Sequence, residues 1–338
     1  MRTTIHTRPT RSGRTGRTGR SLVAGTGLLG LLALTACGAA ETGNSGAGGE
    51  DGEWTGEVVI AQPNWVGAAA NAAVAVHVLQ EDLGIDARVQ QLDETLAWDG
   101  LDDGSIHAIL EDWGGAPEKE QLYIEEKGSV VHAGELGVVG HIGWFVPKAY
   151  ADANPEVLNW ENLNDFADDF RTAESGDKGQ LLNGDPGFTS YDKEIVRELD
   201  LNFEVVEGGS EEALISAIQR ADRDGTPLLT YWWEPHWLNA EVELVEVELP
   251  PYTEECYEDL SAIACAYPEV DLPKFLNADF SENGGVAAEF LKNFRWDTED
   301  QEYVAQLIQA EGMDQADAAA QWVEENRDKV EAWLPEQS

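Results

Sequence analysis

The chain has 338 residues, of which 65 are acidic and 21 are basic, and its formal net charge at pH 7 is −44. This charge excludes nucleic acid as a partner, because a phosphate backbone repels an acidic protein. It also argues against charge-driven docking on anionic lipid. So large an acid excess favours a high-salt environment, where screening shortens the range of self-repulsion. A generally acidic secreted protein is the alternative interpretation.

The N-terminus is typical of a secretory signal peptide. Residues 1–20 carry six arginines and no acid, and the apolar stretch 22–34 is followed by the sequence Leu-Thr-Ala-Cys, which ends at Cys37. The apolar stretch is shorter than the ~20 residues that cross a bilayer. Leu-Thr-Ala-Cys resembles the bacterial lipobox, in which the cysteine becomes the lipidated first residue. We therefore predict a signal peptide over 1–36 and a lipid anchor on Cys37 that holds the protein on the outer face of the cell membrane.

A flexible tether is predicted over residues 37–53, because glycine, alanine and acids dominate there without apolar periodicity. Cys256 and Cys265 lie nine residues apart in an exported chain. A local disulfide between them is therefore expected. We expect neither a metal site nor a cofactor, because no further cysteine or nearby histidine completes a ligand set.

Short β runs alternate with amphipathic helical stretches from residue 54 onward. The first part of the chain predicts strands at 57–62, 86–92 and 106–110 and helices at 67–83 and 117–127. This alternation predicts a mostly parallel sheet with helices on both faces. The rest predicts a strand and crossover from Gly140, strands at 179–183, 227–232 and 241–249, and helices at 162–171, 193–199, 211–224 and throughout 285–334.

The order of elements predicts two α/β lobes joined by crossing segments. Lobe one would comprise residues 55–142 and 240–338, and lobe two residues 143–239. A ligand in such a molecule lies in the cleft, at the carboxyl ends of the strands.

The chain has 12 tryptophans, and several of them follow predicted strands. Trp65 follows the first strand and Trp113 the third, while the run 231–237 (YWWEPHW) follows the strong strand of lobe two. A quaternary ammonium cannot be held by hydrogen bonds, but each ring face can attract it by up to ~2 kcal/mol when desolvated. We therefore predict an aromatic cage for such a cation. Trp322 and Trp333, on C-terminal helices, are predicted to be packing residues.

Several stretches resemble the glycine betaine/proline betaine-binding proteins of ABC importers. They are residues 65–84, 104–115, 134–147, 177–188 and 227–237 and the segment around Cys256 and Cys265. The resemblance implies a two-lobed periplasmic-binding-protein fold (type II-like) with the ligand in the interlobe cleft. It also implies a monomeric, non-enzymatic protein that delivers a quaternary ammonium osmolyte to an ABC permease and its ATPase.

The same resemblance assigns roles to single residues. Trp113 and Trp233 match cage positions, and Phe188 stands where many family members have a third tryptophan. His236 matches a position used for the ligand's carboxylate, and backbone N–H groups near Gly67 or Gly187 could also bind it as a nest. The candidate ligand-binding residues are Trp65, Gly67, Trp113, Gly187, Phe188, Tyr231, Trp232, Trp233 and His236.

Acids adjoin the candidate residues and leave alternatives open. We expect these side chains to be solvated rim charges, although a buried acid would favour a net cation such as choline; they are Glu111, Asp112, Asp185 and Glu234. A sugar-binding protein or glycosidase would also use tryptophans beside carboxylates. Sugars, however, need several hydrogen-bonding side chains beside each ring, and these are sparse around Trp113 and Trp233. No hydrolase, zinc or phosphate motif is present, so we predict a binding protein and not an enzyme. The resemblance implies glycine betaine as its ligand, with choline or carnitine as the alternative.

Overall fold

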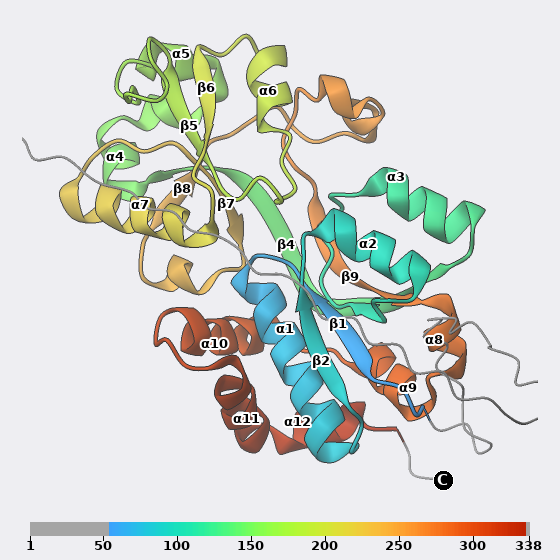
Figure 1. Cartoon of the computed structure of the whole chain (residues 1–338). Coiled ribbons are helices and arrows are strands. Elements are labelled where there is room, and N and C mark those ends of the chain that lie inside the picture. The colour runs from blue at the N-terminus through green and yellow to red at the C-terminus, as the bar shows by residue number, and fades with distance from the viewer. Residues whose placement is uncertain (1–53, 336–338) are drawn as a thin grey trace, which may run out of the picture. The chain divides into compact units, whose positions relative to one another are not determined.

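The computed structural model describes residues 54–335 (Figure 1). The predicted signal peptide, the lipidation site Cys37 and the predicted tether 37–53 lie outside the described residues. Among residues 54–335, no helix is both long enough and apolar enough to span a bilayer.

One mixed sheet of nine strands runs through the described chain. Its strand order is β2-β1-β3-β9-β4-β7-β5-β6, and β8 pairs with β4 beside this path. The strands at both ends of this order are parallel, whereas the pairs that β4 and β9 form in the middle are antiparallel. The strands are β1 (Val58–Gln62), β2 (Ala87–Gln91), β3 (Ala108–Ile109), β4 (Val130–Pro147), β5 (Gly179–Asn183), β6 (Phe203–Glu207), β7 (Thr230–Glu234), β8 (Leu244–Glu246) and β9 (Glu269–Asn277).

The first half of the fold contains β1, β2 and β3, which pair in parallel as predicted. All five residues of β1 are buried, as expected for a strand covered on both faces. Helix α1 continues as one π-helical turn to Asp82, and Gly84 follows with a φ of +66°. The helices of this half are α1 (Val66–His77), α2 (Glu94–Asp103), α3 (Pro117–Glu120), α8 (Ala278–Asn283), α9 (Gly285–Asn293), α10 (Thr298–Gln309), α11 (Gln315–Glu325) and α12 (Arg327–Trp333).

The second half of the fold contains β5, β6 and β7, which also pair in parallel. Helix α7 illustrates why this sequence forms its elements. Ser210 caps its first turn by accepting a hydrogen bond from the N–H of Ala213, and the left-handed Gly225 ends it. Its apolar side chains Leu214 and Ile218 are fully buried. The helices of this half are α4 (Lys148–Ala153), α5 (Leu163–Phe166), α6 (Asp192–Glu198) and α7 (Glu211–Asp224).

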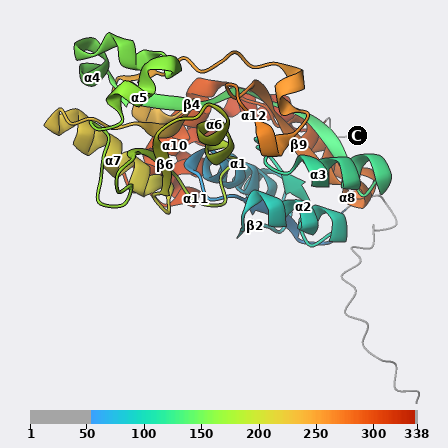
Figure 2. The same cartoon turned by 90° about the horizontal axis from the view of Figure 1, so that it is seen from above.

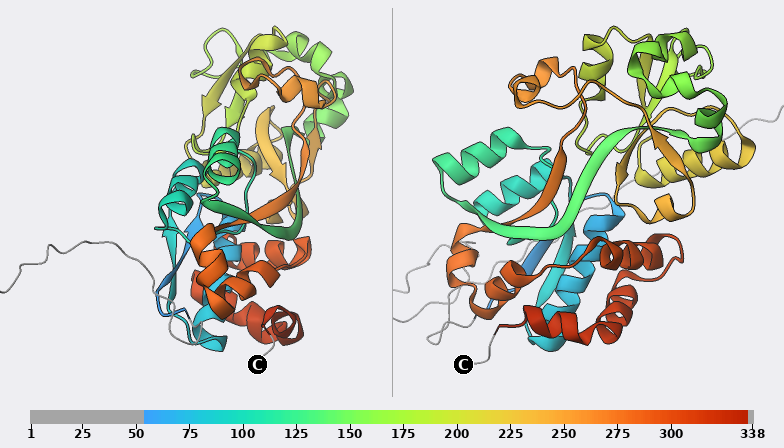
Figure 3. Two further views of the ribbon diagram at one scale, coloured as in Figure 1. Left: turned by 90° about the vertical axis from the view of Figure 1, so that its right-hand side faces the viewer. Right: turned by 180° about the vertical axis from the view of Figure 1, so that it is seen from behind.

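Strands β4 and β9 connect the two halves (Figures 1 and 3). β4 has 18 residues; residues 130–141 pair with β9, 141–145 with β7 and 145–147 with β8. The sequence predicted a strand only from Gly140, because bulges at two glycines interrupt the alternation before it. Gly134 and Gly137 adopt φ values of +92° and +103°, which favour glycine.

The segment between β8 and β9 packs against the second half. Glu248 forms a bridge with Asn159, and the Arg197 guanidinium donates to the carbonyl of Ser261. Cys256 and Cys265 form the predicted disulfide here. The strand predicted over 241–249 is shorter in the structure and covers only Leu244–Glu246. Figure 2 shows this segment, in orange, passing over the elements of the second half.

Three tryptophans outside the candidate site are core residues. Trp322 and Trp333 stack in parallel planes with ring centroids 5.6 Å apart, as packing residues between α11 and α12. Trp98 is fully buried against Phe275 and donates its indole N–H to Asp112. These rings therefore stabilise the first half and are not available to a ligand.

Candidate functional site

Five aromatic side chains and one threonine line a small pocket where the two halves of the fold meet. Two of the rings come from the first half, and the other four lining residues come from the second. The lining residues are Trp65, Trp113, Phe188, Thr189, Tyr231 and Trp233. We call this site the aromatic pocket.

The two tryptophans of the first half are positioned by tight turns at strand ends. Trp65 is the extended residue that precedes α1, with φ −134° and ψ 154°. Trp113 lies in a turn after β3 in which Asp112 Oδ1 accepts the N–H of Gly114 at 2.9 Å. Gly114 adopts a φ of +75°, which a larger side chain would disfavour. Short polar turns thus present both rings beyond the carboxyl ends of the strands.

The rings of the second half come from β7 and from the loop after β5. Tyr231 and Trp233 are two residues apart on β7, so their side chains leave the same face of the strand. Phe188 follows a turn in which Asp185 accepts the N–H groups of Gly187 and Phe188. The Tyr231 hydroxyl donates to the carbonyl of Thr189 at 3.0 Å and ties this loop to the strand.

Edge-to-face contacts connect the walls of the aromatic pocket. Phe188 lies 6.0 Å from Trp65 and 5.5 Å from Trp233 between ring centroids, with interplanar angles of 80° in both pairs. Tyr231 and Trp233 are 6.1 Å apart. Rings set at steep angles present faces from different directions toward one centre, which is the arrangement that surrounds a compact cation.

Glu111 fixes both tryptophans of the first half. Its Oε1 accepts the indole N–H of Trp65 at 2.6 Å and that of Trp113 at 2.7 Å. Its Oε2 accepts the side-chain amides of Asn71 and Gln301. Burial raises the pKa of Glu111 to about 7, and the four N–H donors oppose this rise. A buried carboxylate therefore lies directly behind two walls of the aromatic pocket.

A second pair of buried acids lies beside the pocket. Glu94 hydrogen-bonds to Asp112, and burial followed by the charge of Asp112 raises the pKa of Glu94 well above its usual range. Thr189 donates its hydroxyl to Glu94 at 3.2 Å, a contact between the two halves of the fold. The expectation that Glu111 and Asp112 are solvated rim charges is therefore wrong, because both are buried. Glu234 is exposed as expected, and Asp185 is half-buried.

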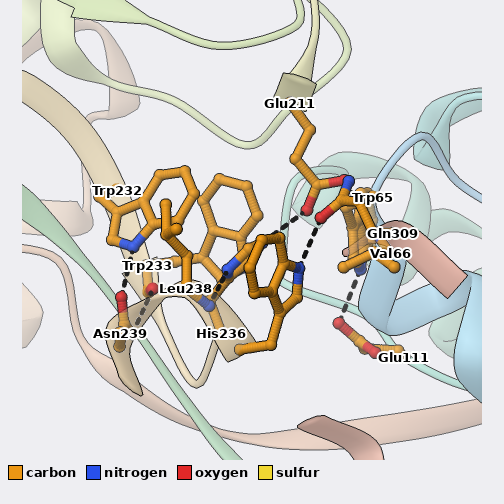
Figure 4. A network of polar contacts seen from close by, with 11 residues as sticks. Trp65, Val66, Glu111, Glu211, Trp232, Trp233, His236, Leu238, Asn239 and Gln309 are labelled. Atoms are coloured by element: carbon orange, nitrogen blue, oxygen red, sulfur yellow. Dashed lines mark hydrogen bonds and ion pairs between the residues drawn. The ribbon is translucent and has the colours of Figure 1, made fainter. Parts of the chain in front are cut away.

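His236 lies outside the lining of the pocket and is bound to Glu211 (Figure 4). Its Nδ1 accepts the N–H of Leu238, so Nε2 carries the proton and donates to Glu211 Oε1 at 3.0 Å. Glu211 Oε2 accepts the backbone N–H of Val66 at 3.0 Å and the side-chain amide of Gln309 at 2.8 Å. Glu211, at the start of α7, thus bonds across to α1 and α10 of the first half.

Three other predicted site residues also lie outside the pocket lining. Trp232 leaves the opposite face of β7, is fully buried, and donates its indole N–H to Asn239. A side chain at Gly67 would approach Glu111 and Gln301, and one at Gly187 would approach Asp185 and Asp93. Within residues 54–335, no cluster of three or more His, Cys, Asp or Glu side chains is suited to hold a metal ion.

Sequence reasoning missed the polar groups that support the pocket. Thr189, Glu211 and the amides of Asn71, Gln301 and Gln309 were not singled out. Glu211 lies 145 residues from Val66 in the chain, and Gln301 lies 190 residues from Glu111. No local pattern marks such pairs, because only the fold brings them together.

Comparison of the sequence with known proteins identifies a family and several relatives. Residues 56–325 match the family model of the substrate-binding domain of ABC-type glycine betaine transport systems. The trimethylamine N-oxide-binding protein of Pelagibacter ubique is 26% identical over 294 residues, which cover 82% of this chain and 90% of that protein. The glycine betaine/carnitine transport binding protein of Listeria monocytogenes is 28% identical over 124 residues, or 37% of each chain.

Solved structures show the same fold. A choline-binding protein of an ABC transporter in complex with choline superposes with a TM-score of 0.67 at 20% identity, covering 82% of this chain and 91% of that one. Lactococcal OpuAC in its closed conformation with glycine betaine gives a TM-score of 0.64 at 18% identity, covering 82% and 99%. The two-lobed α/β fold predicted from the sequence is therefore confirmed. Its family acts in transport, outside the cytoplasm, and is not catalytic. The chain belongs to the family of substrate-binding domains of ABC-type glycine betaine transport systems.

Proposed function

We propose that this protein captures a small trimethylammonium osmolyte in the aromatic pocket and delivers it to an ABC permease. The observation that carries the proposal is the lining itself, with five aromatic rings and a single threonine. Ring faces attract an ammonium that has no N–H to donate. Glycine betaine, predicted from the sequence, and choline share this head group and differ in the tail.

The buried carboxylate of Glu111 supports a cationic ligand. It accepts hydrogen bonds from two of the pocket indoles, and these bonds polarise the rings so that their faces become more electron-rich. Its negative charge also complements a cation in the pocket. A sugar would need polar side chains beside each ring, and the lining supplies only Thr189 and the Tyr231 hydroxyl.

Closure of two lobes is the proposed mechanism. Trp65 and Trp113 would belong to lobe one, and Phe188, Tyr231 and Trp233 to lobe two, so the ligand contacts both lobes only when they close. Ligand binding would shift the population toward the closed form. We also propose a different lobe boundary. The chain would re-enter lobe one at β9 and not at residue 240, because residues 244–262 contact elements of lobe two.

A calorimetric titration of the mature domain tests this function. At high salt, we expect a measurable heat of binding and a stoichiometry of one site for glycine betaine, choline or trimethylamine N-oxide. Maltose serves as the control ligand and should give no heat. Binding of maltose with no response to any of the three methylated compounds would contradict the proposal.

A lipid anchor on Cys37 is proposed to retain the protein on the outer face of the membrane. The acidic surface gives no attraction to anionic lipid, so retention would depend on the lipid. We expect wild-type protein in the membrane fraction and the Cys37→Ser variant either in the medium or unprocessed. Fractionation followed by immunoblotting measures this, and a Cys37→Ser protein that stays processed and membrane-bound would exclude the anchor.

A further inference from the structure

The carboxylate of Glu211 lies beside the aromatic pocket, and the residue is buried, with 3% of its surface exposed. It accepts hydrogen bonds from three donors: the backbone N–H of Val66, the side-chain amide of Gln309 and the imidazole N–H of His236. Val66 directly follows Trp65, and the His236 ring lies 5.2 Å from the Trp233 ring. These donors are therefore next to two walls of the aromatic pocket (Figure 4).

A betaine places a carboxylate one methylene away from its ammonium. With the head group in the aromatic pocket, that carboxylate needs N–H donors within a few bond lengths of the rings. The N-terminus of a helix and a protonated imidazole nitrogen are donors well suited to a carboxylate. One donor of each kind lies beside the pocket, the Val66 N–H at the start of α1 and the Nε2–H of His236, and both are already bonded to the carboxylate of Glu211.

Four of the five side-chain donors within the pocket lining, all except the indole N–H of Trp233, are also bonded to acceptors of the protein. The indole N–H groups of Trp65 and Trp113 bond to Glu111, and the Thr189 hydroxyl bonds to Glu94. The Tyr231 hydroxyl bonds to a carbonyl. His236 accepts a backbone N–H on Nδ1, so it is the neutral tautomer and contributes no positive charge. A ligand carboxylate would thus lie near acidic side chains that repel it and would find few free donors. A cation with a neutral tail carries no negative charge for these side chains to repel.

We propose that Glu211 is a specificity residue that makes the site select a trimethylammonium compound without a carboxylate, such as choline. Its side chain occupies the donors that the carboxylate of a betaine would require. The inference rests on the proposed function, because it concerns the tail of a ligand whose head group enters the aromatic pocket.

Choline and glycine betaine form a matched pair of probes, because they share the head group and differ mainly in a hydroxymethyl or a carboxylate. In the wild-type protein we expect choline to bind roughly 10- to 100-fold more tightly than glycine betaine, since an unpaired or opposed charge is costly in a desolvated site. Calorimetry gives both dissociation constants. This comparison needs no variant, so it does not depend on whether a mutant folds.

The Glu211→Gln variant tests the residue itself. It removes the charge at nearly constant size, and its amide can donate to a ligand carboxylate. We expect the ratio of the glycine betaine to the choline dissociation constant to fall by about tenfold or more. Glu212→Gln removes the same charge one residue later from an exposed position and should leave the ratio unchanged. Melting temperatures check that both variants fold.

Each outcome separates the inference from the function on which it rests. If no methylated ammonium compound binds, the proposed function fails. If the wild type prefers glycine betaine over choline, the function stands and the role of Glu211 is wrong. An unchanged ratio in Glu211→Gln, or an equal change in Glu212→Gln, would also overturn the role of Glu211.

Discussion

Trp233→Ala is expected to weaken choline and glycine betaine binding by roughly 100-fold, the largest effect of any single ring in the pocket. Trp233 is a buried wall that also supports Phe188 at 5.5 Å and Tyr231 at 6.1 Å, so its loss opens the pocket to water as well as removing a ring face. One desolvated ring contributes up to about 2 kcal/mol to cation binding, and the exposed neighbours add to the loss. Isothermal titration calorimetry measures the change.

Two variants separate ring chemistry from stability. Trp233→Phe keeps a ring face at the same position and should retain affinity to within about tenfold. Trp333→Phe makes the same exchange in the remote stack with Trp322 and should lower the melting temperature without changing affinity. Equal affinity losses in Trp233→Ala and Trp333→Phe would mean that the effect reflects folding and not the pocket.

Glu111→Gln is expected to weaken cation binding by roughly 10- to 100-fold through loss of a buried negative charge close to the ligand. The amide oxygen can still accept both indole N–H groups, and the amides of Asn71 and Gln301 can turn their oxygens toward the new NH₂ group. The variant therefore tests charge while the two rings keep a partner. Glu111→Ala, which removes that partner altogether, should also lower the melting temperature.

The raised pKa of Glu111, about 7, makes binding depend on pH. A bound cation favours the ionised carboxylate, so affinity should rise between about pH 5.5 and 7.5 and protons should be released on binding. In the free protein the sign is opposite, because the folded state holds this proton more tightly than the unfolded chain. Its contribution to the free energy of unfolding is thus fully present below the ordinary carboxyl pKa and is lost as pH rises through about 7.

Titrations in several buffers at each pH measure the proton release. Burial also raises the pKa of Asp192 to about 6, and that of Glu94 is raised too, so these groups can add their own pH dependence. The difference between wild type and Glu111→Gln isolates the contribution of Glu111. A pH profile that is identical in the two proteins would show that Glu111 stays in one protonation state.

The aromatic side of the site could be predicted because its signal is local. Trp113 and Trp233 follow apolar strand runs beside glycine or proline, and parallel strands bring their carboxyl ends to one edge. The supporting acids could not be assigned in this way. Glu111 adjoins Trp113 in a chain rich in acids, and nothing in the sequence distinguishes it from the exposed Glu234. Its burial depends on Asn71 and Gln301, which only the fold brings to it.

The strands that join the two halves were the part of the fold that was hardest to predict from the sequence. β9 contains Asp271, Pro273 and Lys274, which break the pattern of a buried strand. Yet Lys274 is fully buried, and its ammonium donates to the carbonyls of Leu291, Lys292 and Phe294 at the C-terminal end of α9. Lys274 is buried because it caps a neighbouring helix, and the sequence of β9 alone contains no pattern that predicts this role.

The division of the aromatic pocket between two halves of the fold has a consequence for unloading. Trp65 and Trp113 share one carboxylate acceptor in the first half, while Phe188, Tyr231 and Trp233 belong to the other half. A transporter that pulls the halves apart therefore need not touch the ligand. Under the proposed function, separation alone would leave the cation with part of its ring contacts and readmit water, so affinity would fall in a single step.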